Sequence, residues 1–484
     1  MKMVFKKKVC LLILFLTMII AGCVVEGNPD FWANSYFIKK SPYPMGLINP
    51  IKIEYKYSNP RTIIQTNDNG YLFGGSIRTF EESNAMLVKL SSTGVVEKGF
   101  VVHDGLTMGE DRQSGIVTSL FDTGNGFVIA GWTNRDESSN IIKGNTSMWL
   151  MKTDYAGGIV WNRAYGQFSY YEDMDSGSND AFLAGVVSST VMTSDGGFVM
   201  GGKQLVKVNA HGDIEWSKIN TLGSIKDLKL TNDNGLIIVA EASGFNTNTI
   251  AKTDDMGNII WSKEYHIGDL QSTFNTVEVI TNESGAETGY LLGGKVIYPV
   301  RRSSDCLLVA LNTDGNLNWN TTYNGVIYDD DNMIFSEETI GSIIRSNDGN
   351  YLVGITSESF QADLNMEDAI VIKMDSNGTI IWEKAYDVYG GEFRGMAATN
   401  NGFVISSELS GQGDWHSLVV TCQEDGTVPD HGDDLTIKDV SFMSSTPESV
   451  IIDTTGDDIF TSIDLVTDDL RSTLKDSDTD RVRR

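Results

Sequence analysis

The sequence is dominated by a short unit that recurs along most of its length. In its clearest copy, Ala369–Tyr386, an apolar run at 369–374 leads into Asp375-Ser-Asn-Gly378, and a second run rich in β-branched and aromatic residues follows. Apolar residues at alternate positions of the first run indicate a mostly buried strand of normal length. Asp and Gly between the two runs favour a tight turn. The unit therefore predicts a β-hairpin.

The hairpin recurs with a second unit before it, which reads as a turn and a strand. Further hairpin copies run at Trp149–Tyr165, Leu205–Trp216, Ile250–Tyr265 and Leu307–Tyr323, with weaker ones from Met86 and Leu418. The upstream unit, such as Asn401-Gly-Phe-Val-Ile405, is found seven times, starting at Asn69, Asn125, Gly196, Asn234, Thr288, Gly349 and Asn401. One more apolar strand precedes each turn, so a period of roughly 40–70 residues holds four antiparallel strands. Four-stranded blades repeated around an axis form a β-propeller. We predict an all-β, seven-bladed propeller over residues 51–430.

Blade seven lacks a good last strand, because Asp430 follows Pro429 where other copies have tryptophan. A spare strand lies at the other end of the repeat region. Ile51-Lys-Ile-Glu-Tyr-Lys-Tyr57 resembles the repeated Trp-x-Lys-x-Tyr strand, with Ile53 in the tryptophan place. We predict that it completes blade seven, which removes two sheet edges and closes the ring.

Tryptophan recurs at one position of the hairpin, at Trp161, Trp216, Trp261, Trp319 and Trp382. Each could bury roughly 150–250 Å² against a neighbouring blade. Repetition at one blade position favours this packing role over sugar stacking, which is the alternative.

The N-terminus has the features of a targeting segment. Residues 1–22 combine Lys6-Lys-Lys8 with an apolar run at 9–20, which is short for a transmembrane span. Ile20-Ala-Gly-Cys23 resembles the lipobox of prokaryotic lipoproteins, which implies lipid attachment at Cys23. The alternative is an ordinary secretory signal with a chance cysteine. We expect a membrane-anchored, extracytoplasmic protein in the cell envelope, with residues 23–50 as a tether.

Charge and cysteine content exclude some classes of partner and bond. The chain has 65 acidic against 37 basic residues, a net charge of −28, which argues against nucleic acid as a partner. Cys306 and Cys422 fall in blades five and seven, too far apart for a disulfide, so we expect two free, buried thiols. Beyond blade seven, residues 431–484 form an acidic extension. Strands are possible at Thr436–Phe442 and Val450–Asp453, and the charged end is expected to be disordered.

Binding residues are expected where the blades differ from one another. The turns within hairpins are short and alike, whereas the loops between second and third strands, and between blades, are long and dissimilar and share the opposite face. Loops on a rigid scaffold commonly carry function.

One such loop places oxygen ligands at close spacing and is a candidate Ca²⁺ site, formed by Asp173, Asp175, Asn179 and Asp180. Asp329-Asp-Asp-Asn332 is a second cluster. No glutamate closes either as in the twelve-residue calcium loop, and solvated acidic loops are the alternative.

Aromatic residues of the variable face are candidates for binding a glycan or peptide, namely Tyr170, Tyr171, Tyr298, Tyr328, Phe360 and Trp415. They could equally brace the loops. No nucleophile elbow, phosphate-binding loop or HExxH pattern occurs in the sequence, so we assign no catalytic residue.

The repeat resembles two groups of prokaryotic propellers. One is the set of secreted or lipid-anchored propellers with Asp-Gly-Gly-(Phe/Tyr) and Lys-x-Asp-x-x-Gly-x-x-x-Trp repeats, as at Lys373–Trp382. The other is the quinoprotein-like propellers, some of which hold a calcium-bound quinone on the axis. No cofactor ligand can be carried over residue by residue, and fold does not fix function.

These observations favour a non-catalytic, monomeric propeller lipoprotein that binds an envelope protein, a glycan or another external ligand, with no cofactor except possibly Ca²⁺. One alternative is an extracytoplasmic enzyme acting on a carbohydrate or an alcohol at the mouth of the central channel. Another is a structural component of a surface layer.

Overall fold

The computed structural model describes residues 51–53, five short strands between 436 and 469, and residues 58–428 with gaps at 79–81, 103–111, 114, 134–146, 166–186, 221, 242–247, 300–302, 325, 330–331, 336, 359–367, 388–390 and 412–413. Everything described is strand, turn or loop. No helix in this part of the chain is long and apolar enough to cross a membrane.

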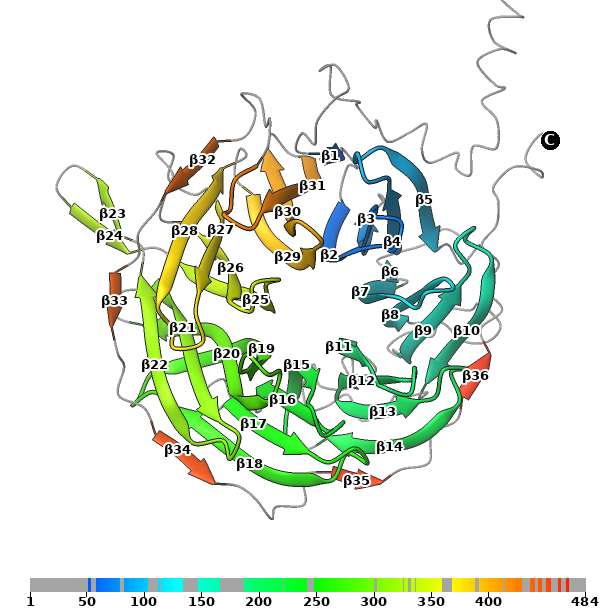
Figure 1. Ribbon diagram of the computed structural model, residues 1–484, viewed down its shortest axis with the longest axis horizontal. Coiled ribbons are helices and arrows are strands. Elements are labelled where there is room, and N and C mark those ends of the chain that lie inside the picture. Colours follow the sequence, from blue (N-terminus) through cyan, green and yellow to red (C-terminus); the bar gives the residue numbers. More distant parts are fainter. Residues whose placement is uncertain are drawn as a thin grey trace, which may run out of the picture. The chain divides into compact units, whose positions relative to one another are not determined.

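The described residues form the predicted seven-bladed propeller (Figure 1). Blade one consists of β2 (Ser58–Gln65), β3 (Tyr71–Arg78), β4 (Glu82–Leu90) and β5 (Val96–Val102). Blade two consists of β7 (Gly115–Asp122), β8 (Phe127–Thr133), β9 (Ser147–Thr153) and β10 (Ile159–Tyr165). Blade three consists of β11 (Val187–Met192), β12 (Phe198–Gly202), β13 (Gln204–Val208) and β14 (Ile214–Asn220). In each blade the strands follow one another from the axis outward and pair antiparallel.

The remaining blades repeat this order. Blade four consists of β15 (Ser224–Leu230), β16 (Leu236–Glu241), β17 (Asn248–Thr253) and β18 (Ile259–His266). Blade five consists of β19 (Gln271–Thr281), β20 (Glu287–Tyr298), β21 (Ser303–Asn312) and β22 (Leu317–Asn324). Blade six consists of β25 (Glu338–Arg345), β26 (Tyr351–Ser357), β27 (Asp368–Met374) and β28 (Ile380–Asp387). Blade seven has β29 (Gly391–Thr399), β30 (Gly402–Gly411) and β31 (Asp414–Gln423).

The innermost strands form a complete ring. Each contacts the innermost strand of the next blade, and β29 of blade seven contacts β2 of blade one.

Two small elements lie outside this scheme. Strand β6 (Arg112–Gln113) pairs parallel with β4, and β23 (Val326–Asp329) and β24 (Asn332–Phe335) form a separate hairpin between blades five and six.

Strand β1 (Ile51–Ile53) pairs antiparallel with β31, the outermost strand of blade seven. The predicted register is wrong by four residues. Ile53 lies opposite Ser417, which corresponds to the pairing of Tyr386 with Ala369 in blade six, so Ile53 stands in the tyrosine place rather than the tryptophan place. A four-residue slip is invisible to an alternating pattern, because an even shift keeps every side chain on its face.

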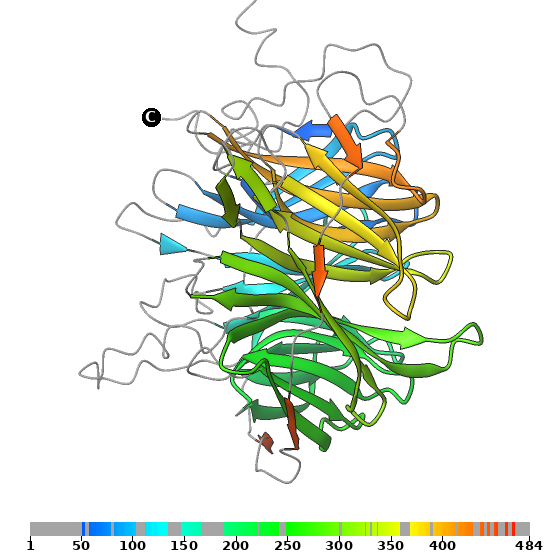
Figure 2. The same cartoon turned by 90° about the vertical axis from the view of Figure 1, so that its left-hand side faces the viewer.

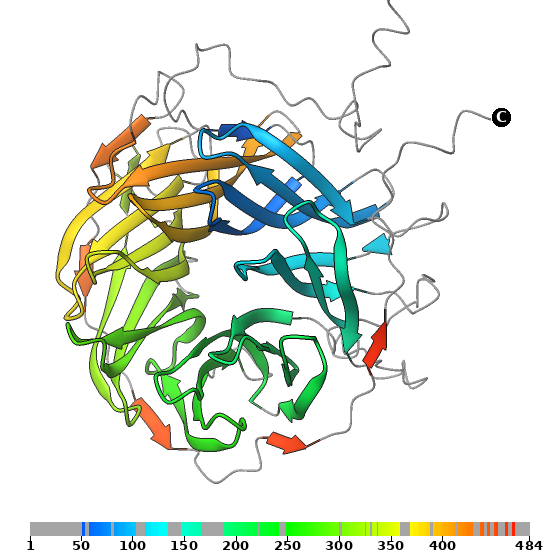
Figure 3. The same cartoon turned by 45° about the vertical axis from the view of Figure 1, so that its right-hand side comes forward.

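The C-terminal extension runs around the rim of the propeller. Its strands are β32 (Thr436–Asp439), β33 (Met443–Ser445), β34 (Val450–Asp453), β35 (Phe460–Ser462) and β36 (Thr467–Asp469). They pair antiparallel with the outer strands of blades six, five, four, three and two, in that order. Figures 1, 2 and 3 show these strands on the outer edges of the blades. We call β32–β36 the belt. Two of its strands were expected from sequence, but their partners were not.

The belt meets the blades in one repeated register. Asp439 lies opposite Lys384, Asp453 opposite Lys263 and Asp469 opposite Arg163, while Ser445 and Ser462 lie opposite Thr322 and Lys218. In blade five the Thr322 and Ser445 hydroxyls are 2.7 Å apart. Four of the five belt strands therefore end opposite the same position of the outer strand, two residues after the tryptophan, where a basic residue stands. The exception is β33, whose last residue lies opposite Thr322, three residues after Trp319.

The repeated tryptophans pack between blades, as predicted. Each ring lies on the glycine of the last hairpin turn in the next blade. A Cβ added to Gly257, Gly315 or Gly378 would stand 2.8–3.0 Å from the ring of Trp216, Trp261 or Trp319, respectively. These glycines have φ between +70° and +83°, a conformation that side chains with a Cβ disfavour. Glycine is thus required at this position for two reasons: the turn needs a positive φ, and the indole above it leaves no room for a Cβ.

In several blades the residues two and four after the tryptophan extend this contact. The Nζ of Lys218 lies 2.6 Å from Asn258 Oδ1, and that of Lys263 lies 2.8 Å from Asn316 Oδ1, both just past the turn glycine of the next blade. The hydroxyl of Tyr386 donates to the carbonyl of Gly426 at 2.8 Å. We call this arrangement of tryptophan, basic residue and tyrosine on the next turn the inter-blade clasp. Cys306 and Cys422 are buried free thiols, as expected.

Replacing Trp261 with alanine tests the clasp. Trp261 is 9% exposed, and its Nε1 donates to the carbonyl of Thr313 at 3.0 Å. W261A should lower the free energy of unfolding by about 3–5 kcal/mol, measured from urea unfolding. The matched control is the neighbouring Ile260→Ala, because Ile260 is 49% exposed and should cost much less. Equal losses in the two variants would contradict the packing role.

Deleting residues 51–57 tests the role of β1 in closing the ring. The deletion exposes the edge of β31, so the melting temperature should fall by more than about 5 °C in circular dichroism. Deleting residues 24–50 instead should leave the melt unchanged. A melt unaffected by loss of 51–57 would show that β1 does not hold the ring together.

Candidate functional site

Most of the predicted site residues lie outside the part of the chain that the structure describes. This holds for the candidate calcium ligands Asp173, Asp175, Asn179 and Asp180, for the aromatic residues Tyr170, Tyr171 and Phe360, and for Cys23. Of the second acidic cluster, Asp329 and Asn332 are opposite each other at the end of the β23–β24 hairpin.

Three predicted aromatic residues belong to described strands. Tyr328 lies on β23 opposite Met333, and Trp415 lies on β31 opposite Ser410. Tyr298 ends β20, is partly buried, and packs against the apolar core between blades four and five. For Tyr298 this placement agrees with the bracing interpretation.

The strand bounds show which connections vary. Between second and third strands, blade three has a single residue between Gly202 and Gln204, whereas blade two has thirteen between Thr133 and Ser147. In contrast, the last hairpin turns share one geometry, in which the glycine NH donates to the carbonyl three residues earlier, as from Gly378 to Asp375 at 3.1 Å. One face of the ring is therefore uniform and the other is not.

A ring of β-bulges surrounds the axis. Every innermost strand shifts its register at the same place, and the bulged residues are Arg61, Thr118, Ser188, Lys226, Asn275, Gly341 and Arg394. A bulge leaves one residue out of the ladder and turns its side chain. Sequence reasoning missed this ring, because a bulge leaves no mark in a pattern of short apolar strands.

Polar groups next to the bulges connect the blades around the axis. Asp227 of blade four is buried, accepts a hydrogen bond from Ser189 of blade three at 2.7 Å, and accepts others from Thr276 and the NH of Val277 in blade five at 3.1 and 3.0 Å. The hydroxyl of Thr276 also accepts from the NH of Ile343 in blade six at 3.3 Å. One carboxylate thus ties three blades together.

Charged side chains near the axis are paired. Lys226 contacts Glu241 at 2.6 Å, and Arg394 contacts both Glu392 and Glu408 at 2.5 Å. Burial alone would lower the pKa of Lys229, but Asp227 and Glu278 outweigh it and raise that pKa.

Burial also raises the pKa of Glu278, against the lowering effect of Lys229. A buried carboxyl with a raised pKa is the kind of group that general acids use, yet this one is held by a lysine and by the NH of Val279 at 3.1 Å. The arrangement thus fits a structural network, since its charges compensate one another. Among the described residues, no group of three or more His, Cys, Asp or Glu is placed to hold a metal ion.

The face of the ring with the uniform hairpin turns carries an ion pair that recurs in several blades. In blades one, three, four and six, a buried lysine of the third strand contacts an aspartate of the first turn, with distances of 2.7–2.9 Å for Lys89–Asp68, Lys207–Asp195, Lys252–Asp233 and Lys373–Asp348. Burial alone would raise the pKa of Asp195, but hydrogen bonds from Thr193, Lys207 and the NH of Gly197 lower it to about 2. These aspartates hold the turn and the lysine together.

Comparison with known proteins gives a likeness of fold only. No family model matches the chain, and no curated protein matches it. Among solved structures, Sqt1 of Chaetomium thermophilum is 10% identical over 81% of this chain and 87% of its own, with a TM-score of 0.41. Sqt1 bound to the N-terminus of ribosomal protein L10 is 11% identical over 75% of this chain and 97% of its own, with a TM-score of 0.38.

The pH dependence of stability tests the aspartate–lysine pairs. Because the folded pKa of Asp195 lies below its ordinary value of 3.8, the stabilisation is present above pH 4 and is lost as the pH falls towards 2. Asp195→Asn should therefore destabilise the protein at pH 7, and the difference from wild type should fade between about pH 4 and 2. Urea midpoints across this range measure it. The exposed Asp255→Asn serves as control, and a D195N difference independent of pH would contradict the assignment.

Proposed function

We propose that this chain is a lipid-anchored, extracytoplasmic propeller that binds another envelope protein or an external ligand through its variable face, without catalysis. The observation that carries the proposal is the contrast between the two faces of one rigid ring. Connections on one face repeat with the same hydrogen bonds, whereas those on the other range from one residue to thirteen between equivalent strands. Variable loops on a uniform scaffold are typical of a recognition surface.

The polar residues around the central axis favour a structural role over a catalytic one. The hydroxyls of Ser189 and Thr276, from the two adjacent blades, donate to the carboxylate of Asp227, and Arg394 is paired with Glu392 and Glu408 within blade seven. A nucleophile or general base needs a partner arranged towards substrate, whereas these groups are arranged towards neighbouring strands. The proposed anchor rests on the N-terminal sequence, where Ala21-Gly-Cys23 follows an apolar run.

The test is capture from native envelopes. The tagged full-length chain is crosslinked in intact cells, purified, and its companions are identified by mass spectrometry. One protein recovered in a fixed ratio to the chain is the expected result for a scaffold. A matched variant in which residues 135–145, between β8 and β9, are replaced by a short Gly-Ser linker should fold and lose the partner if this loop contributes to binding.

The anchor is tested with the same cells. Cys23→Ala should move the protein from the membrane fraction to the soluble fraction, because its lipid is lost, whereas Cys10→Ala should stay with the membrane. A membrane-bound C23A protein would contradict lipid attachment. Absence of any stoichiometric companion, with the wild-type protein intact at the membrane, would contradict protein binding.

A further inference from the structure

Blade one departs from the clasp, as does blade seven, whose outer strand β1 has Ile53 in the tyrosine place. In blade one the outer strand β5 pairs with β4 so that Lys98 lies opposite Lys89, as Trp382 lies opposite Lys373 in blade six and Trp216 opposite Lys207 in blade three. Lys98 therefore stands in the tryptophan place. The next clasp positions are Phe100 and Val102, where other blades have a basic residue or threonine, and then tyrosine or asparagine.

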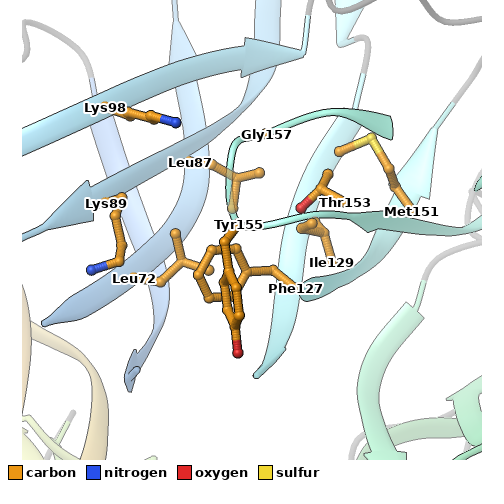
Figure 4. A pocket seen from close by; sticks show the side chains of 10 residues that line it. All are labelled: Leu72, Leu87, Lys89, Lys98, Phe127, Ile129, Met151, Thr153, Tyr155 and Gly157. Carbon is orange, nitrogen blue, oxygen red and sulfur yellow. The ribbon is translucent and has the colours of Figure 1, made fainter. Parts of the chain in front are cut away.

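The rest of the tryptophan socket is present between blades one and two. In two other interfaces the indole lies against the turn glycine and near an aromatic ring of the next blade: Trp261 lies near Tyr290 at 6.0 Å and Trp382 near Phe403 at 6.1 Å. The equivalent groups in blade two are Gly157 and Phe127, and both line a pocket here (Figure 4).

The pocket walls are apolar. Leu72 and Leu87 come from blade one, and Ile129 and Met151 from blade two, with Lys98 and Tyr155 at the rim (Figure 4). The pocket is partly open to solvent and has a volume of about 20 Å³, room for one water. The Lys98 side chain takes part of the space that tryptophan fills elsewhere. Its Nζ is bound to the carbonyl of Ala156 at 2.9 Å, an exposed contact that water can replace.

The turn beside the pocket also differs from its equivalents. It carries Tyr155 where the other turns have Ala210, Asp255, Thr313, Ser376 and Glu424. Tyr155 is 46% exposed, packs edge-on against Phe127 with ring centroids 5.1 Å apart, and donates its hydroxyl to Asp122 at 2.8 Å. An exposed, oriented tyrosine above an apolar socket is a common composition for a peptide-binding surface.

The strand next to the pocket has a free edge. Within the described residues β5 pairs only with β4, whereas the fourth strands of blades two to six each carry a belt strand. Blade seven resembles blade one in this respect, because β1 stands as its fourth strand and pairs only with β31. The sequence of this edge, Gly99-Phe-Val-Val102, is apolar. An unpaired apolar edge is a template for an added strand.

We infer that the socket between blades one and two is a docking site for an extended partner segment that inserts a tryptophan side chain beside Lys98 and runs along β5. This deepens the proposed function, on which it rests, by naming a site and the chemistry of its partner. The interfaces of this same molecule show what the site accepts: an indole between a turn glycine and an apolar or aromatic side chain, carried by the fourth strand of the blade itself. Because β5 already occupies that place, the indole of the partner reaches the socket from one strand further out. On binding, Lys98 leaves the pocket and the indole takes its place.

The chain provides the probe. A peptide with the sequence Ile380–Asp387 carries Trp382, which fills the equivalent site between blades six and seven. It is made with 5-fluorotryptophan and titrated with the full-length protein in ¹⁹F NMR, beside a peptide with alanine in place of tryptophan. We expect the tryptophan peptide to bind wild type at least about tenfold more tightly than the alanine peptide, as for a buried aromatic anchor.

Variants at Lys98 decide where the peptide binds. Lys98→Trp fills the socket with a side chain of the protein itself, so this variant should bind the tryptophan peptide at least about tenfold more weakly than wild type. Lys98→Ala empties the socket, so that variant should bind the peptide at least as tightly as wild type. Val160→Trp, at a 58% exposed position, is the matched control for an added tryptophan and should bind as wild type does. If K98W fails to fold by circular dichroism, Lys98→Phe replaces it.

Three results would overturn the inference: equal affinity for the two peptides, unchanged binding to K98W, or binding that appears only after deletion of residues 24–50, which would assign the socket to Trp32 of this chain. Failure of the proposed function is distinguishable in the envelope capture. A partner recovered equally with wild type and K98W refutes the docking site and leaves the scaffold function standing. No partner with either protein refutes the scaffold function itself.

Discussion

The contact of an indole with a left-handed glycine is the constraint on which the ring depends. The hairpin turn needs a residue at positive φ, and the tryptophan of the preceding blade needs a surface without a Cβ, so one glycine meets both demands at Gly212, Gly257, Gly315, Gly378 and Gly426. In most of these five interfaces the same strand also places a base or a tyrosine on that turn, so the two blades that meet there are oriented by one another. Blade spacing thus follows from local sequence, and repetition of the contact builds the ring.

Open blade edges are the second demand that this architecture has to meet. Each blade ends in a strand with one free side, and free edges invite pairing with other chains. The belt covers the fourth strands of five blades, and β1 supplies the fourth strand of blade seven, which covers the edge of β31. Aspartates at three belt positions lie opposite basic residues of the blades, which adds charge complementarity to the backbone pairing. The acidic extension therefore has a structural place, although its composition suggests a solvated tail.

The sequence could predict what is local and repeated. Strand alternation and turn glycines gave seven blades, and recurrence of tryptophan gave its packing role, because both are set by residues close in the chain. It could not predict the partners of the belt strands, since strands of three or four residues carry almost no periodic signal. For four of the five, moreover, the paired residues are more than a hundred positions apart, as from Thr322 to Ser445. The predicted register of β1 was wrong because a shift by an even number of residues leaves the alternation of side chains between the two faces unchanged. The sequence also did not reveal the ring of β-bulges near Asp227, because polar residues on an innermost strand look the same in sequence as residues that face solvent.

Blade one shows how a departure from a repeat can be interpreted physically. Substituting lysine for tryptophan at position 98 removes a buried ring from an interface whose glycine and aromatic floor, Gly157 and Phe127, are retained. A structural repeat gains nothing from keeping a socket without its occupant, since apolar surface left without contacts costs stability. A repeat position that loses its usual packing residue without gaining another contact is expected where a protein binds a partner. In the same interface β5 pairs with no further strand among those described, so the missing indole and the open edge coincide on β5. An added strand that carries an aromatic side chain would complete both.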